Sequence, residues 1–147
     1  MTWSELEKQR RIAKEPTTKS EIDELRALAE RNLQDAALPQ LSADGRFSMA
    51  YNAARTLATV AIRSAGYRIK QFGGAHYNTF LALPLAMGPS FDMLAAYFDN
   101  CRQSRNDLSY GAASVVSESD ATELLEKTTE FRESVEDWLS KNHPTLI

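Results

Sequence analysis

Residues 47–65 read FSMAYNAARTLATVAIRSA, and this stretch decides the fold. Its apolar residues recur at steps of three and four, which is the period of one face of an α-helix. Its alanines allow neighbouring helices to pack closely, and Gly66 follows as a typical helix end. The apolar face comprises Phe47, Ala50, Tyr51, Ala54, Leu57, Ala58, Ala61, Ile62 and Ala65. We therefore predict a long helix that buries this face in a helical bundle.

The opposite side of this helix is polar. It carries Asn52, Thr56, Thr59 and Arg63, with Arg55 at the boundary between the two sides. A polar edge of this kind fits either a binding site or a solvated surface, and the solvated surface is the simpler interpretation.

Helical patterns also lie on both sides of this stretch. Further helices are expected over residues 3–13, 20–37, 75–87 and 90–110, and from residue 119 to the His143-Pro144 pair. Ser20 and Asp23 form a capping-box pattern at the start of the second of these helices.

The connections between these helices show no strand signal. Residues 67–74 are predicted to be an exposed, mobile loop that ends in two glycines. The last helix has an apolar face of Leu124, Thr128, Phe131, Val135 and Trp138. The sequence therefore predicts an all-α fold, an antiparallel bundle of about five or six helices.

Composition and length fit one globular domain. The chain has 147 residues, 43% of them hydrophobic, which is enough for a substantial core. We expect a single helical domain over 1–147, with an N-terminal helical extension at 1–17 and a tail at 141–147. The longest apolar run, residues 80–87, is too short to cross a membrane. A charged N-terminus and a single cysteine, Cys101, favour a cytoplasmic protein.

Charge is distributed unevenly along the chain. Residues 40–110 carry seven Lys or Arg against four Asp or Glu, whereas residues 111–147 carry three against eight. The middle segment is therefore mildly basic, although the whole chain has a net charge of −3. Its cations leave room for a local anion-binding pocket. The candidates are Arg55, Arg63, Arg68, Lys70, Arg102 and Arg105.

Arg105 is the most informative of these cations. It falls near the centre of an apolar helical stripe formed by Phe91, Leu94, Phe98, Cys101 and Leu108. No acidic residue lies three or four positions from it, and an unpaired buried charge costs several kcal/mol. We therefore expect its partner to come from another helix, another subunit or a ligand.

Several familiar chemistries have no signal here. The chain lacks a Gly-rich phosphate loop, an HExxH motif and a CxxC pair, so neither a metal nor another cofactor is expected. Cys101 is expected to pack in the core, and His143 belongs to the tail. His76 follows Gly73-Gly74 at a helix start, where it either satisfies backbone groups or faces a cleft.

Residues 101–110 read CRQSRNDLSY and resemble the signature of HEPN domains, in which an arginine and a polar residue precede a histidine by a short spacing. Arg105-Asn106 matches the arginine-polar pair. The alanine-rich helix, the loop leading to His76 and the acidic last helix follow the family's order over about residues 20–140.

The resemblance implies a helical bundle that forms a homodimer, with the motifs of two subunits meeting in one cleft. Many HEPN proteins are metal-independent ribonucleases, often toxins paired with a nucleotidyltransferase-like antitoxin. In that role Arg105 would hold an RNA phosphate and Asn106 would support it. The family's histidine position is Tyr110 here, and a phenol of pKa about 10 is a poor base at neutral pH. Arg102, His76, Arg68 and Arg55 are further candidates for binding.

Three functional hypotheses remain, two of them based on this resemblance. The first is an RNA-directed HEPN protein, a weak or specialised endoribonuclease or toxin-like component that uses Arg105, Asn106 and either Tyr110 or His76. The second is a noncatalytic HEPN module that binds a nucleotide, a nucleic acid or a nucleotidyltransferase partner. The third is a structural helical oligomerisation protein in which Arg105 pairs with a carboxylate such as Glu130. None of the three involves a membrane.

Overall fold

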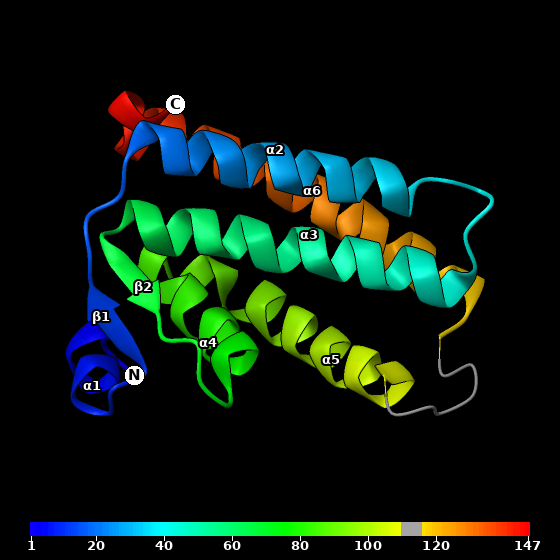
Figure 1. Ribbon diagram of the computed structural model, residues 1–147, viewed down its shortest axis with the longest axis horizontal. Coiled ribbons are helices and arrows are strands. Elements are labelled where there is room, and N and C mark those ends of the chain that lie inside the picture. Colours follow the sequence, from blue (N-terminus) through cyan, green and yellow to red (C-terminus); the bar gives the residue numbers. More distant parts are fainter. Residues whose placement is uncertain (110–115) are drawn as a thin grey trace.

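The computed structural model describes residues 1–109 and 116–147, and a central helix, α3, organises them (Figure 1). α3 spans Ala43–Ser64 and contacts the other long helices. These are α2 (Lys19–Ala36), α4 (Ala75–Met87), α5 (Asp92–Ser109) and α6 (Glu118–Asn142). Short 3-10 turns cover Pro89–Phe91 and Pro144–Leu146. The predicted all-α bundle is confirmed.

α3 is buried on both of its sides. The predicted apolar face lies in the main core, where Tyr51 and Ala54 are fully buried. The opposite side was expected to be solvated, and this is wrong for Thr56 and for Arg63, which is 2% exposed. The reason is the central position of α3, which leaves neighbours on every side. Gly66, with φ +93°, follows the end of the helix as predicted.

The N-cap of α2 lies two residues before the predicted one. Thr18, not Ser20, is the N-cap, and its hydroxyl oxygen accepts a hydrogen bond from the backbone N–H of Glu21. Both Thr18 and Ser20 stand three residues before an acidic residue, so the sequence offered two starts for one helix. At the start of α6, Ser117 and Asp120 form a reciprocal capping box.

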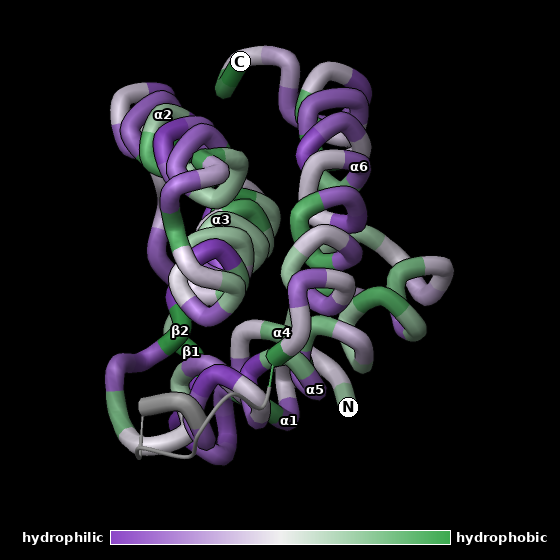
Figure 2. Tube along the Cα trace, turned by 90° about the vertical axis from the view of Figure 1, so that its right-hand side faces the viewer, coloured by the Kyte–Doolittle hydropathy of each residue, from purple (hydrophilic) through white to green (hydrophobic). Residues whose placement is uncertain are grey.

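α6 packs its apolar side against α3. Figure 2 shows the hydrophobic residues of α6 mainly on the side that faces α3. Leu124, Phe131 and Val135 are buried as predicted, but the next buried position is Leu139, and Trp138 lies at the edge of the core. No helix in the described residues is long and apolar enough to span a membrane.

The N-terminal segment forms a strand that the sequence did not predict. The first helix, α1, spans only Trp3–Lys8, and the chain then forms β1 (Ile12–Lys14). β1 pairs antiparallel with β2 (Tyr67–Ile69), which replaces part of the expected mobile loop. Three residues are too few for an alternating pattern, and pairing with a segment more than fifty residues away decides the structure.

The sheet closes a second, smaller core. It contains Leu6, Ile12, Ile62, Ile69 and Ala82. α1 and the sheet therefore cover one end of α3 and α4, while the main core is formed by residues of α2 to α6.

The apolar stripe of α5 is only partly as predicted. Phe98 is fully buried and Cys101 is 6% exposed, but Arg105 is half-buried rather than central in the core. The buried positions of α5 differ from the predicted stripe. Ala95, rather than Leu94, is the buried residue one turn before Phe98. Arg105 therefore lies at the edge of the bundle.

Candidate functional site

A polar cavity of about 340 Å³ lies between the start of α4 and the last turns of α5. We call it the arginine pocket. Its lining residues are Gln71, Phe72, Gly74, Ala75, His76, Tyr77, Arg102, Arg105 and Asn106. None of these described residues is a carboxylate, so the cavity presents mainly hydrogen-bond donors and positive charge.

α5 contributes three neighbouring side chains to this pocket. Arg105 and Asn106 lie three and four positions after Arg102, so all three side chains share one side of the helix. The Arg102 Nε atom donates to Asp99 Oδ1 at 2.7 Å, which holds its guanidinium in place. Arg105 lies over the ring of Tyr51, with 5.6 Å between its Cζ atom and the ring centroid. α5 thus presents two guanidinium groups to the pocket, and their contacts with Asp99 and Tyr51 already hold them in position.

α4 brings His76 to the same cavity. Its N-cap is Gly74, whose φ of +87° is a left-handed conformation that glycine adopts without strain. The Nδ1 atom of His76 is 3.1 Å from the hydroxyl oxygen of Tyr51 on α3, a hydrogen bond whose donor depends on the tautomer. Tyr51 is fully buried, so this contact holds the imidazole in one orientation.

The surroundings of His76 oppose its protonation. Burial, followed by the charges of Arg55, Arg105 and Arg102, lowers the pKa of His76 to about 4. Burial also raises the pKa of the Tyr51 hydroxyl to about 12, against the opposing effect of the arginines. At neutral pH both groups are therefore uncharged, and the positive charge of the pocket comes from arginine.

Arg55 lies on the other side of His76. It lines a smaller cavity of about 80 Å³ that shares Gln71, Ala75 and His76 with the arginine pocket. Its Nε atom is buried and has no hydrogen-bond partner among the described residues. Burial lowers the pKa of this guanidinium, and Arg105 lowers it further. Arg55 therefore adds a third cation near His76.

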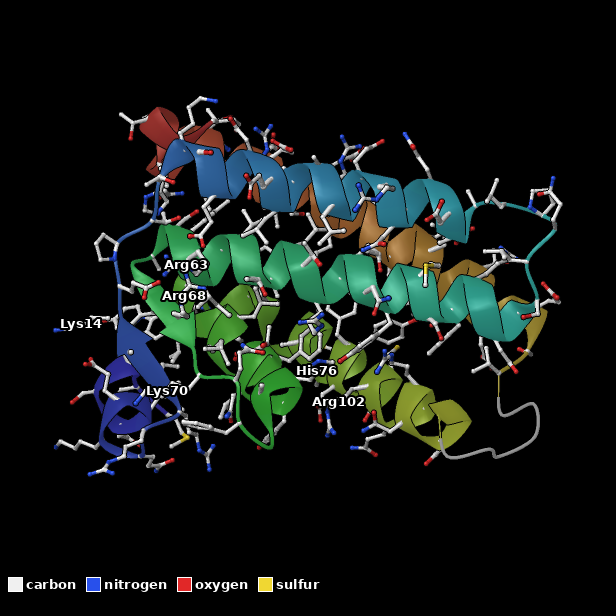
Figure 3. The ribbon with its side chains drawn as sticks, in the orientation of Figure 1. Lys14, Arg63, Arg68, Lys70, His76 and Arg102 are labelled. Atoms are coloured by element: carbon white, nitrogen blue, oxygen red, sulfur yellow. The ribbon has the colours of Figure 1, made fainter. Side chains whose placement is uncertain are left out.

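Arg68 lies elsewhere, in an ion-pair cluster with Arg63. Arg68 contacts both Glu15 and Glu21, with 2.9 Å between its Nη2 atom and Glu21 Oε2. Figure 3 shows Arg63 and Arg68 together near the end of α3, away from Arg102 on α5. Although Arg68 borders the smaller cavity, its charge is balanced by these two carboxylates.

The structure therefore brings together four of the predicted site residues, Arg102, Arg105, Asn106 and His76, with Arg55 adjacent. Tyr110 lies outside the described residues.

Sequence reasoning missed the role of Tyr51, because its place in the apolar face of α3 predicted only core packing. Its hydroxyl was the available signal, since a buried phenol needs a hydrogen-bond partner.

A second large cavity is mainly apolar, and its charged residues are acidic. It lies between α4 and α5, has a volume of about 330 Å³ and is lined mainly by apolar residues such as Phe80, Leu81 and Leu85. Its charged lining residues are Asp92 and Asp99, which do not suit an anion. Among the described residues, no group of three or more His, Cys, Asp or Glu side chains is arranged to hold a metal ion.

Comparison with known protein families gives a match to this chain. A family model described as SAV_6107-like HEPN matches residues 37–136. The matched segment contains α3 to α5 and most of α6, and therefore every residue of the arginine pocket. No curated protein and no solved structure matches the chain.

Proposed function

Because the match over residues 37–136 shows that this chain belongs to the HEPN family, we propose that it is an RNA-directed protein whose arginine pocket holds an RNA phosphate. The observation that supports this proposal is the convergence of Arg102, Arg105, Asn106 and His76 on a cavity with no carboxylate among its described lining residues. Phosphate oxygens accept strong, charge-assisted hydrogen bonds from such donors, and RNA presents them along its whole backbone.

Two guanidinium groups can contact one phosphate from neighbouring turns of α5. Arginine presents a planar fork of donors that matches two phosphate oxygens, and its charge persists at every physiological pH. The Asn106 amide adds a neutral donor one residue after Arg105. Because Arg102 is held by Asp99, less conformational entropy is lost when an anion binds.

The same pocket supports a metal-independent endoribonuclease reaction, as in a toxin-like component. In that reaction the 2′-oxygen of RNA forms a bond to the adjacent phosphorus while the bond from phosphorus to the 5′-oxygen breaks, and the released 5′-oxygen takes a proton from water. Arg105 would stabilise the charge that develops on the phosphoryl oxygens. His76 accepts the 2′-hydroxyl proton only in the tautomer whose Nδ1–H donates to Tyr51, since Nε2 then has a free lone pair.

The second candidate is a noncatalytic HEPN module that binds RNA or a nucleotide, or contacts a nucleotidyltransferase partner. The low pKa of His76 favours it, because a group with a pKa of about 4 is a weak base at neutral pH. In the other tautomer, Tyr51 donates to Nδ1 and the imidazole offers only a donor to the pocket. Either candidate is compatible with a homodimer in which two arginine pockets share one cleft. Light scattering in solution measures whether the protein is a dimer.

Replacement of Arg105 tests the RNA-directed proposal. We expect Arg105→Ala to weaken binding of a fluorescent single-stranded RNA about tenfold, because it removes a charge-assisted phosphate contact. Fluorescence anisotropy at fixed salt measures this affinity. Arg31→Ala, which removes an exposed arginine on α2, is the matched control and should bind as the wild type does.

Cleavage of the same RNA in the presence of EDTA distinguishes the two candidates. Products that disappear in Arg105→Ala would support the ribonuclease, whereas binding without products would support the noncatalytic module. Equal RNA affinity of Arg105→Ala and the wild type would contradict RNA binding through the arginine pocket in either candidate.

A further inference from the structure

A second basic cavity adjoins the arginine pocket at the N-terminal end of the molecule. It has a volume of about 390 Å³ and is lined by Gln9, Arg10, Arg11, Phe72, Gly73, Gly74, Tyr77 and Asn78. We call it the N-terminal pocket. It shares Phe72, Gly74 and Tyr77 with the arginine pocket, and its lining also contains no carboxylate among the described residues. The two cavities are therefore neighbours separated only by the loop before α4.

Two exposed aromatic side chains stand where the cavities meet. Phe72 is 68% exposed and Tyr77 is 40% exposed, although neither belongs to a hydrophobic core. The backbone around Phe72 is nevertheless fixed, because its N–H donates to Lys70 and its carbonyl accepts from Ala75. Tyr77 also lies beside Arg102, whose Cζ atom is 5.7 Å from the ring centroid. The loop thus presents two aromatic faces between two sets of arginines.

The arginines of the N-terminal pocket are held in place by the small sheet. Arg10 has φ +60°, so the chain turns sharply between α1 and β1. The carbonyl of Arg11 accepts from the N–H of Lys70, and Nη1 of Arg11 donates to Asn78 Oδ1 at 3.4 Å. Figure 3 shows Lys70 on this side of the molecule, beside α1 and the sheet. This turn lies outside residues 37–136, so the family match does not account for it.

Cations alternating with exposed aromatic rings suit one class of ligand. A single strand of RNA has phosphates for the arginines and unstacked bases whose faces can stack on aromatic rings. A duplex hides those faces inside its helix and could not use Phe72 or Tyr77 in this way. A lone phosphate or mononucleotide would occupy only one of the two cavities.

We propose that the bound ligand is a single strand of RNA that runs from the arginine pocket, across Phe72 and Tyr77, to Arg10 and Arg11. This inference rests on the proposed function. It adds that the RNA is single-stranded and that it follows this path over the surface. The arginine pocket binds one phosphate, the aromatic pair stacks on bases, and the N-terminal pocket binds a phosphate further along the strand.

Two variants test this path separately from the arginine pocket. Arg10→Asn combined with Arg11→Gln removes both charges, while asparagine tolerates the left-handed backbone and glutamine keeps a donor for Asn78. Phe72→Ala removes the exposed ring. The control is Arg31→Gln on α2. Thermal melting by circular dichroism checks that each variant folds, and Arg10→Asn alone replaces the double variant if the latter does not.

Fluorescence anisotropy with a labelled single-stranded RNA of about ten nucleotides, and calorimetry with uridine monophosphate, provide the readouts. We expect each path variant to weaken oligonucleotide binding about tenfold. The variants at Arg10 and Arg11, which do not line the arginine pocket, should leave mononucleotide affinity within about twofold. The salt dependence, as the slope of log K against log salt, should fall by about 0.7 for each lost phosphate contact. Arg105→Ala should weaken binding of both ligands.

The outcomes separate the two proposals. If Arg105→Ala weakens oligonucleotide binding but both path variants bind as the wild type does, the proposed path is wrong and the proposed function is unaffected. Equal affinity for a matched RNA duplex would also overturn it. If the wild type binds no oligonucleotide, the proposed function itself fails.

Discussion

His76 is a histidine whose surroundings keep it neutral. Burial is the main cause of its lowered pKa, and the guanidinium groups of Arg55, Arg105 and Arg102 add to this effect. An anion bound between these arginines would cancel part of that field and raise the pKa of His76 towards its ordinary value. Ligand binding would therefore bring the imidazole closer to a pKa useful for proton transfer.

The low pKa of His76 predicts how stability depends on pH. The folded protein protonates this group near pH 4, whereas an unfolded chain does so near pH 6.5. Between these values the unfolded state binds more protons, so the free energy of unfolding decreases as the pH falls from 6.5 towards 4. Urea unfolding at pH 7 and pH 5 measures this loss, and it should be smaller in His76→Gln. An identical loss in both proteins would contradict the low pKa.

Arg63, rather than Arg105, is the arginine on which the fold depends most. Its side chain is only 3% exposed. It donates to the Glu21 carboxylate and to the carbonyl oxygens of Glu15, Pro16 and Tyr67. Hydrogen bonds from Thr17, Arg68 and Arg63 outweigh the opposing effect of burial and lower the pKa of Glu21 to about 2. One guanidinium thus joins α3 to the segment before α2 and to β2.

We expect Arg63→Ala to lower the free energy of unfolding by about 3 kcal/mol, because it leaves several buried acceptors without a donor. The half-buried Arg105 serves as the comparison, and Arg105→Ala should cost about 1 kcal/mol or less. Urea denaturation measures both values. A loss of a few kcal/mol in Arg105→Ala would instead support the structural oligomerisation protein, in which Arg105 stabilises the bundle.

At the scale of elements, the start of α2 shows how two similar signals compete. Thr18 caps the helix, while Ser20 lies inside its first turn and is exposed. We expect Thr18→Ala to destabilise the protein by about 1 kcal/mol, and Ser20→Ala to change stability by less than about 0.5 kcal/mol. Chemical denaturation of the two variants checks this order. Equal losses would show that the helix has two alternative starts.

Long periodic elements could be predicted from the sequence, and short ones could not. α3 follows its apolar period from Phe47 onward. α4 is shorter and apolar on nearly all sides, and its predicted bounds of 75–87 come from the glycines and prolines around it. β1 and β2 have only three residues each, and their pairing depends on the register of Ile12 with Ile69, which no local pattern encodes.

The candidate site was predictable to the extent that it lies on one helix. Arg102, Arg105 and Asn106 are neighbours in sequence and in space. His76 joins them only because Gly74 turns the chain and α4 packs beside α5, which are tertiary effects. Arg63 was misplaced for a related reason, since a helical period cannot show that a helix is covered on all sides.

At the scale of the whole molecule, two cores of unequal size hold the chain together. The smaller core under α1 and the sheet has five buried residues, whereas the main core spans α2 to α6. We expect amide hydrogens of Ile12–Lys14 and Tyr67–Ile69 to exchange with solvent faster than those in the middle of α3. Hydrogen exchange followed by mass spectrometry measures this difference. Equal protection would mean that both cores open in one step.

The acidic last helix gives the molecule an electric dipole. Residues 111–147 carry eight Asp or Glu against three Lys or Arg. α6 lies on the far side of α3 from the loop that precedes α4 (Figures 1 and 2). A polyanion that approaches from the α6 side meets repulsion, and one that approaches from the loop side meets Arg102, Arg105, Arg10 and Arg11. In the proposed complex with RNA, this distribution of charge would orient the incoming strand before any contact forms, and salt would weaken the effect.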